Sequence, residues 1–187
     1  TMYSTTEKLL QFAATKRKLA VQDKDGIRWD TGFVPYSFKE DVPVAQRPAS
    51  QSVHLEFWTT ASDYIKDYAV DWIYDPAANL YKRNNGGVAH TDFNNKKQLT
   101  AKNIVVLKMI ESRANDGYEG NQHLLYRTKG TGKASIFMDG KETAGTWRKD
   151  SRTARTLLFD SAGLPVKLDK GTIWFEILPT DGVLTVK

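Results

Sequence analysis

The chain has 187 residues, with 27 Lys and Arg against 22 Asp and Glu, which gives a net charge of +5. A chain of this length can bury a core without help from metals or disulfides, and because it has no cysteine, disulfides, cysteine-ligated metal centres and cysteine nucleophiles are all excluded. The small positive excess weakly favours anionic polymers or membranes over acidic proteins as contacts.

The first predicted element is a helix over about residues 5–18. Ser4 and Glu7 have the spacing of a capping box, in which a hydroxyl caps the first turn and a carboxylate lies three residues later. Basic residues at 16–18 follow, where the helix dipole favours cations. These signals together predict one amphipathic helix at the start of the chain.

The next segment is unlike its neighbours in composition. Residues 40–52 are rich in Pro, Ala, Gln and Ser and poor in large apolar side chains, which predicts a linker or a long surface loop. We therefore divide the chain into residues 1–50, the remnant of an N-terminal domain with its linker, and residues 51–187, a β-rich C-terminal domain.

Short apolar or alternating runs, each ended by turn-forming residues, predict strands through the rest of the chain. Asn84-Asn85-Gly86-Gly87 predicts a tight hairpin, because Asn and Gly tolerate the positive φ that such turns need. Asn103–Ile110 is the most apolar run and predicts a central strand covered on both faces. The predicted fold class is α+β, an N-terminal helix followed by a predominantly antiparallel sheet of about eight strands. Further predicted strands lie at 53–58, 68–74, 80–83, 134–137, 156–159 and 173–178, and another begins at 124–127.

A cationic turn between two C-terminal strands has the most specialised surface chemistry. Arginine can bind phosphate or carboxylate through two parallel hydrogen bonds, and a neighbouring Trp could stack on a sugar or base. The turn is therefore a candidate site for an anionic glycopolymer, joined by Lys133 and Lys141 if the neighbouring strands align. The alternative is a solvated hairpin whose cations protect a sheet edge. The candidate residues are Trp147, Arg148, Lys149, Ser151, Arg152 and Arg155.

A second candidate is a polar site at His90, Asp92 and Asn103, with Asp75 as a further member. Residues 90 and 92 would point to the same face of a strand, which allows a general-base pair or half of a metal site. A metal site needs three or more ligands, and the other two histidines have no ligand-like spacing. The alternative is a histidine that stabilises a turn next to an Asx turn, and we expect no metal.

No pattern predicts a catalytic residue or a cofactor. Gly130-Thr131-Gly132-Lys133 lacks the first glycine and the final Ser or Thr of a phosphate-binding loop, since those positions hold Arg127 and Ala134. It also lies between strands instead of before a helix. We expect these glycines to form a bulge or a tight turn.

Several separated motifs, in the expected order, resemble the C-terminal domain of the YerB-like family of bacterial lipoproteins over roughly residues 70–179. The start of the chain, residues 2–9, is similar to a segment late in the N-terminal domain of that family. The resemblance implies an α+β fold and an extracytoplasmic domain that is membrane-anchored through a lipid in the parent protein. Most of the N-terminal domain, the signal peptide and the lipid-accepting cysteine of the family are absent from this chain. The motifs are residues 74–83, His90-Thr91-Asp92, residues 98–106 and residues 130–179.

On these grounds we expect a non-catalytic binding module of the cell envelope that contacts an anionic cell-wall polymer. We expect no specific nucleic-acid partner, and membrane contact only through a lipid anchor that this chain lacks. Two alternatives stay open. One is a cell-wall glycan hydrolase or transferase whose cleft is shared with the missing N-terminal half, and the other is an adaptor that docks on another envelope protein through an exposed sheet edge.

Overall fold

The computed structural model describes residues 5–16, 26, 34–58, 62–120 and 123–187. The chain divides into two compact units, residues 1–35 and residues 36–187, and each is described here by itself. In the described parts of both units, no helix is long and apolar enough to cross a lipid bilayer.

The first unit contains the predicted helix, α1 (Thr6–Thr15). The cap is Thr5, whose side chain accepts a hydrogen bond from the Lys8 backbone N–H at 3.3 Å, while the predicted cap Ser4 lies outside the described residues. A backbone hydrogen bond and the Thr5 hydroxyl lower the pKa of Glu7 in the first turn. The expected extension through residues 17 and 18 lies outside the described residues.

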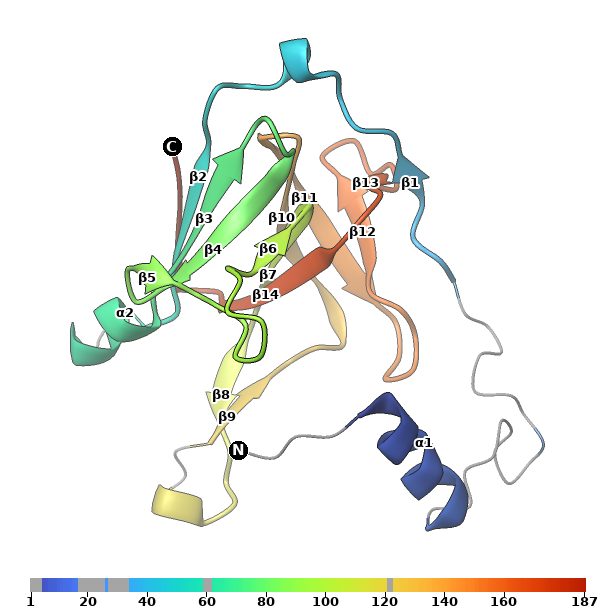
Figure 1. Cartoon of the computed structure of the whole chain (residues 1–187). Helices are drawn as coiled ribbons and strands as arrows, with labels where there is room; N and C mark the ends of the chain where they lie inside the picture. Colours follow the sequence, from blue (N-terminus) through green and yellow to red (C-terminus); the bar gives the residue numbers. More distant parts are fainter. Residues whose placement is uncertain (1–4, 17–25, 27–33, 59–61, 121–122) are drawn as a thin grey trace. The chain divides into compact units, whose positions relative to one another are not determined.

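The second unit is mostly β-sheet and mainly antiparallel, so the predicted fold class is confirmed in outline (Figure 1). One sheet has six strands, with the order β15-β2-β3-β4-β5 and β6 beside β4. The predicted hairpin joins β4 to β5, where Asn85 pairs with Val88 across Gly86 and Gly87, both at positive φ. The strands are β2 (Ser52–Glu56), β3 (Val70–Asp75), β4 (Leu80–Asn85), β5 (Val88–Ala89), β6 (Thr100–Ala101) and β15 (Val183–Val186).

The other large sheet has five strands in the order β12-β11-β10-β7-β14. All its neighbours are antiparallel except β7 and β14, which run parallel. The strands are β7 (Asn103–Met109), β10 (Gly130–Met138), β11 (Lys141–Lys149), β12 (Leu157–Asp160) and β14 (Ile173–Pro179).

Smaller elements complete the second unit. Two short strands, β1 (Phe38–Lys39) and β13 (Leu168–Asp169), pair in parallel, and β8 (Glu111–Arg113) and β9 (Leu124–Tyr126) form an antiparallel ribbon. There are also a helix α2 (Ser62–Tyr68) and two short 3-10 helices, η1 (Val44–Gln46) and η2 (Tyr118–Gly120). The sequence analysis did not predict α2, and it assigned Tyr68, the last residue of this helix, to a strand.

The prediction of a central strand covered on both faces is confirmed for β7. Ile104 and Val106 point into a core shared with the six-stranded sheet, which contains the fully buried Trp72 and Tyr81. Val105, Leu107 and Met109 point to the other face of the five-stranded sheet and belong to a second core. Consecutive apolar residues, here residues 104–107, are the expected sequence of a strand that is covered on both faces.

Residues 36–50 belong to the second unit, so the unit begins well before the boundary near residue 50 that the composition suggested. Tyr36 packs against the second core, and the Ser37 carbonyl accepts a hydrogen bond from the Leu168 N–H at 2.9 Å. Lys39 forms ion pairs with Asp139 and Asp169. A segment poor in large apolar residues is thus held by a few long-range polar contacts, which local composition does not reveal.

Candidate anion-binding surface

The structure separates the predicted cationic turn into a buried part and an exposed part. Trp147 is only 2% exposed, and its indole N–H donates a hydrogen bond to the Lys108 carbonyl at 2.9 Å. The expectation that this Trp could stack on a ligand is therefore wrong. The indole reaches Lys108 by passing beside Gly132, where a Cβ would lie 2.6 Å from the indole nitrogen.

Most of the remaining turn residues stabilise the turn itself. The Lys149 ammonium donates to the Ala154 carbonyl, and the Ser151 hydroxyl accepts from the Ala154 N–H at 3.0 Å. The Arg155 guanidinium lies over the ring of Tyr36, 3.7 Å from its centroid, in a cation–π contact. Arg155 is thus directed toward Tyr36 and away from the surface described next.

Arg148 and Arg152 are the exposed arginines of the turn. Arg148 forms an ion pair with Asp150 at 3.3 Å, but both side chains are more than half exposed, so solvent weakens the pair. Thr131 of β10 pairs with Arg148, and Lys133 lies two residues further along β10 on the same face. Lys141 pairs with Met138 at the opposite end of the hairpin, so the alignment that we expected for it does not occur.

Two hollows meet at Thr131 and gather cations from several segments. The first has a volume of about 440 Å³ and is lined by Lys108, Arg127 and Lys133 among others. The second has a volume of about 370 Å³ and is lined by Lys129, Gly130, Thr131, Arg148, Lys149 and Asp150. Thr131 lines both hollows, and we call their lining the Thr131 surface. Asp150 is the one acidic residue in these two linings.

The first hollow lies where two strands separate. The pairing of β10 with β7 ends at Ala134 and Leu107, while β7 continues to Met109 beside β14. Beyond that point the Trp147 indole, and not β10, bonds the Lys108 carbonyl. The gap that opens between the two strand ends is lined by Met109, Gly132 and Trp147 at its base.

The electrostatics of this hollow favour an anion. Burial lowers the pKa of Lys108, Asp181 opposes the change, and the charge of Lys133 lowers the pKa further. The Lys108 ammonium donates to the carbonyls of Pro179 and Gly182, so it is held in place at the edge of the hollow. Like charges that are held close together are stabilised when an anion binds between them.

The predicted polar site does not assemble. The Nδ1 atom of His90 accepts a hydrogen bond from the Arg83 guanidinium at 2.5 Å. Burial lowers the pKa of His90, and the positive charge of Arg83 lowers it further. Asp92 accepts hydrogen bonds from the N–H groups of residues 94 and 95, the Asx turn that was the alternative. Asn103 is fully buried and exchanges hydrogen bonds with the Asp169 backbone. Asp75 likewise caps the turn at residues 77 and 78 and pairs with Lys82.

A separate charged cluster lies inside the second unit, and we call it the Lys39 network. The Lys39 ammonium lies 2.5 Å from a carboxylate oxygen of Asp139 and 2.5 Å from one of Asp169. Burial opposes ionisation of both carboxyls, but hydrogen bonds from Lys39 and Asn79 bring the pKa of Asp139 below its usual value. Burial and the neighbouring Asp139 raise the pKa of Asp169.

Paired carboxyls with opposite pKa shifts are typical of acid–base catalysis. Here, however, Asp139 is 4% and Asp169 0% exposed, and neither lines the hollows described above. Lys39, the Asn79 amide and the Val42 N–H bond both oxygens of Asp139 and one oxygen of Asp169, while the Oδ2 atom of Asp169 is buried with no hydrogen-bond partner among the described residues. We therefore assign this network to stability. Within the described residues, no three His, Asp or Glu side chains are placed to hold a metal ion.

Sequence analysis found Arg148, Lys149 and Lys133 but missed Lys108, Arg127 and Lys129. One signal was present, because Arg127, Lys129 and Lys133 occur at even spacing on either side of Thr131. Even spacing puts residues on one face of a strand. Lys108 could not be found in this way, since it comes from another strand.

Comparisons with known proteins place the chain among uncharacterised relatives. The family model described as "Protein of unknown function (DUF3048) C-terminal domain" matches residues 60–175. The crystal structure of the YerB protein from Bacillus subtilis matches with a TM-score of 0.70 and 18% sequence identity, over 98% of this chain. The match spans 54% of that protein, so the chain corresponds to about half of its length. No curated protein matches the chain.

Proposed function

The chain belongs to the DUF3048 family of proteins of unknown function, and we propose that it is a non-catalytic binding module for an anionic polymer, which it contacts through the Thr131 surface. The proposal keeps the ligand class that the sequence suggested. It moves the contact from the turn at 147–155 to the adjoining ends of β10 and β11.

The observation that carries the proposal is the charge balance of two joined hollows. Their cations come from β7, from the segment before β10, from β10 and from β11. Asp150 is the single carboxylate in the two linings and its pair with Arg148 is exposed, while Asp181 acts on Lys108 from outside them. Charges of one sign in adjoining hollows raise the local concentration of an oppositely charged ligand.

The shape of the surface favours an extended ligand over a small one. Two shallow hollows that share one residue can hold successive charged groups of one chain. Each additional group then binds at the high effective concentration set by the first. Most of the bound counterions are released at the same time, which makes such binding strong at low salt and weak at high salt.

The location of the protein belongs to the same proposal. We propose an extracytoplasmic domain that is held at the membrane by a lipid in the parent protein, as the resemblance of the sequence motifs to the YerB-like lipoprotein family implies. A polymer of the cell envelope, such as a teichoic acid, is then the anionic partner within reach. The hydrolase and adaptor alternatives have no comparable support from a site in the described residues.

Binding to immobilised teichoic acid, peptidoglycan and a nucleic acid of mixed sequence tests the proposal. We expect retention on teichoic acid at low salt, and a loss of about tenfold in affinity in the double variant Lys133→Met/Arg148→Met, since each lost charge-assisted contact weakens binding several-fold. Lys141→Met is the matched control, because it removes an exposed lysine of β11 outside the surface.

Equal retention of the double variant and the control would refute the proposed surface. Equal retention on nucleic acid and teichoic acid would show a general polyanion binder and would overturn the envelope polymer as the specific partner.

A further inference from the structure

We infer that the first hollow of the Thr131 surface binds one phosphate ester group, with the phosphoryl oxygens between Lys108, Arg127 and Lys133 and the attached carbon skeleton against Ile110. This inference rests on the proposed function, because it names the chemical group of the polymer that the surface recognises.

The three cations come from three different segments of the chain. Lys108 is on β7, Arg127 follows β9, and Lys133 is on β10. A tetrahedral group with several oxygens can accept from donors that converge from different directions, whereas a planar carboxylate is matched best by a single arginine. The arrangement therefore favours phosphate over carboxylate.

Hydrogen bonds fix several of the segments that surround the hollow. The Arg127 backbone N–H donates to the Ile110 carbonyl at 2.9 Å, which ties the segment before β10 to the end of β7. The Thr180 N–H donates to the Met109 carbonyl at 3.0 Å, which places Thr180 on the other side of the hollow. The Thr131 hydroxyl donates to the Trp147 carbonyl at 2.7 Å, so it can still accept a hydrogen bond.

The charge state of the hollow agrees with this ligand. No Asp or Glu is among its lining residues, so the cations there have no carboxylate partner within the lining. Burial lowers the pKa of Lys108, Asp181 outside the lining partly offsets this, and the charge of Lys133 lowers the pKa further. A phosphate group would supply the missing negative charge.

The size of the hollow indicates more than a bare ion. A volume of about 440 Å³ falls within the range of ordinary ligand pockets, roughly 300–1,000 Å³. Part of its lining is apolar, and Ile110 is 46% exposed beside it. A polyol or sugar attached to the phosphate would cover this apolar part and add affinity that inorganic phosphate lacks.

Four probes separate the possible sources of the phosphate group: inorganic phosphate, a glycerol phosphomonoester, a glycerol phosphodiester and glycerol itself. Binding is measured by titration calorimetry and by shifts of the Thr131 and Gly132 amide signals in nuclear magnetic resonance spectra. We expect both esters to bind more tightly than inorganic phosphate, glycerol not to bind, and the shifts to centre on the first hollow. A preference for the diester indicates a group inside a polymer, and a preference for the monoester indicates a polymer end.

Two single variants and one control locate the contact. Arg127→Met and Lys133→Met should each weaken ester binding by about tenfold, because each removes a charge-assisted contact. Arg148→Met, which lines the second hollow, should weaken polymer binding and leave ester binding unchanged within about twofold. Unchanged unfolding midpoints show that the variants fold, which is expected because Lys133 and Arg127 are exposed.

The two proposals fail in different ways. Polymer binding without ester binding, or with ester binding that Lys133→Met leaves intact, overturns the phosphate hollow and leaves the proposed function standing. Ester binding at the hollow without polymer binding overturns the proposed function and supports the hollow. A carboxylate compound that binds as tightly as the esters overturns the assignment to phosphate.

Discussion

Two charged regions of the second unit differ in how their charges are matched. In the Lys39 network one ammonium lies between two carboxylates, and both carboxylates are buried. On the Thr131 surface several cations line shallow hollows beside one exposed carboxylate. The difference indicates that the first region stabilises the fold, whereas the cations of the second region are available to bind an anionic ligand.

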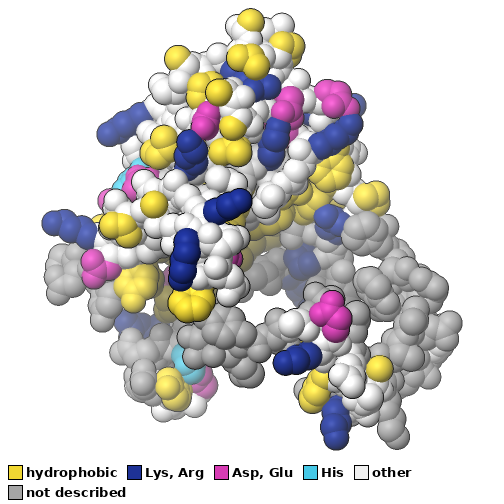
Figure 2. Space-filling view, in the orientation of Figure 1, with side chains coloured by type: hydrophobic (Ala, Val, Ile, Leu, Met, Phe, Trp, Pro, Cys, Tyr) yellow, Lys and Arg dark blue, Asp and Glu magenta, His cyan; other side chains and the backbone are white. Residues whose placement is uncertain are grey.

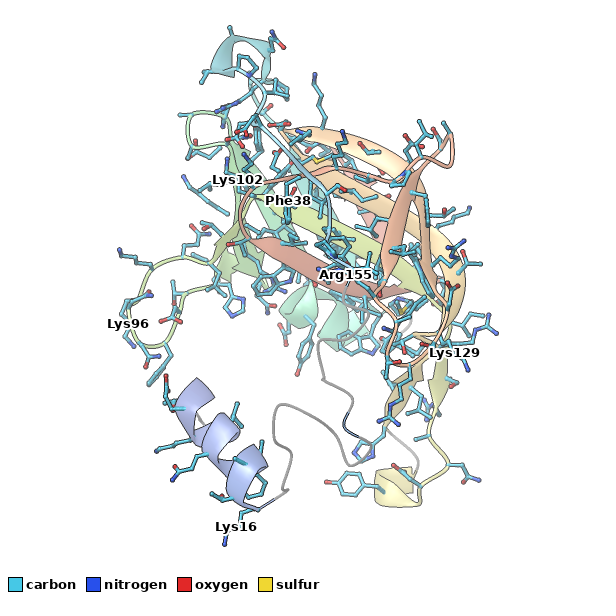
Figure 3. The ribbon with its side chains drawn as sticks, turned by 90° about the vertical axis from the view of Figure 1, so that its right-hand side faces the viewer. Lys16, Phe38, Lys96, Lys102, Lys129 and Arg155 are labelled. Carbon is cyan, nitrogen blue, oxygen red and sulfur yellow. The ribbon has the colours of Figure 1, made fainter. Side chains whose placement is uncertain are left out.

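Figure 2 shows Lys and Arg side chains beside Asp and Glu side chains over the upper part of the second unit. In Figure 3 Lys102, which pairs with Asp41, and Lys129 of the Thr131 surface lie on opposite sides of the unit. Variants of an ion-paired lysine and of the cations of the Thr131 surface can therefore be compared in the same protein.

The largest expected effect comes from breaking the Lys39 network. Lys39→Met would leave Asp139 and Asp169 buried without their cation, and removing one partner of a buried ion pair costs about 3–5 kcal/mol. The Lys39 side chain is 30% exposed, so we expect a loss near the lower end, about 3 kcal/mol. Urea unfolding measures this loss.

Lys141→Met is the control for that variant, since Lys141 is exposed and surface substitutions usually change stability by about 0.5 kcal/mol or less. A Lys39→Met protein as stable as this control would contradict the stabilising role of the network.

The next effect concerns the floor of the Thr131 surface. Gly132→Ala would place a Cβ 2.6 Å from the Trp147 indole nitrogen and 2.7 Å from the Lys108 carbonyl oxygen. The indole can shift, but the carbonyl belongs to the backbone, so the strands must also move, and overpacking of this kind costs about 1–3 kcal/mol. We expect a lower unfolding midpoint together with altered Trp fluorescence. Gly132 is not at positive φ, so this cost reports crowding; Gly117→Ala, at positive φ with no atom near the added Cβ, gives the cost of backbone strain alone for comparison.

A smaller effect on stability is expected at His54, a histidine that lies between two carboxylates. His54 lies 2.7 Å from Asp71 and 3.2 Å from Glu56. Burial lowers its pKa, but hydrogen bonds to the two carboxylates outweigh burial and raise the pKa above 6.5. The folded protein therefore binds this proton more tightly than the unfolded chain does. Its contribution is complete below the unfolded pKa and disappears as the pH rises through the folded pKa.

For this reason the stability difference between the wild type and His54→Gln should be larger at pH 5.5 than at pH 8.5. The side chains are about one third exposed, so we expect less than about 1 kcal/mol. A difference that grows with pH would have the wrong sign for this pairing.

The smallest expected effect is on the affinity of the Thr131 surface for the polymer. Asp150→Asn removes the one carboxylate of the Thr131 surface, and an exposed ion pair is worth about 0.2–1 kcal/mol. We expect teichoic acid binding to strengthen by about two- to threefold and stability to stay the same. Weaker binding in this variant would show that Asp150 takes part in recognition.

The sequence predicted what depends on local patterns and missed what depends on pairing between distant strands. The β7 strand followed from an unbroken apolar run, and the turn at Gly86-Gly87 followed from residues that tolerate positive φ. Alternation along β11 gives Trp147 and Arg148 opposite faces, but it does not say which face is buried. That choice depends on β7 and β12, which lie on either side of the β10–β11 hairpin.

The Lys39 network shows the same limit more clearly. Lys39 on β1 is 100 residues from Asp139, in the turn after β10, and 130 residues from Asp169 on β13. No spacing rule connects Lys39 with Asp139, and the low apolar content around Lys39 pointed to a linker instead. The sequence predicted only part of the ligand-binding surface. Arg148 and Lys149 belong to one charge cluster in the sequence, whereas Lys108 lies on β7, far from that cluster.

The salt dependence of teichoic acid binding tests the central claim most directly. For the wild type, the logarithm of the binding constant should fall linearly with the logarithm of salt concentration, because bound counterions are released. In Lys133→Met/Arg148→Met the slope should be smaller by about one to two, the number expected when two contacts with the polymer are lost. Identical slopes in the wild type and the double variant would contradict the claim that the Thr131 surface binds the polymer.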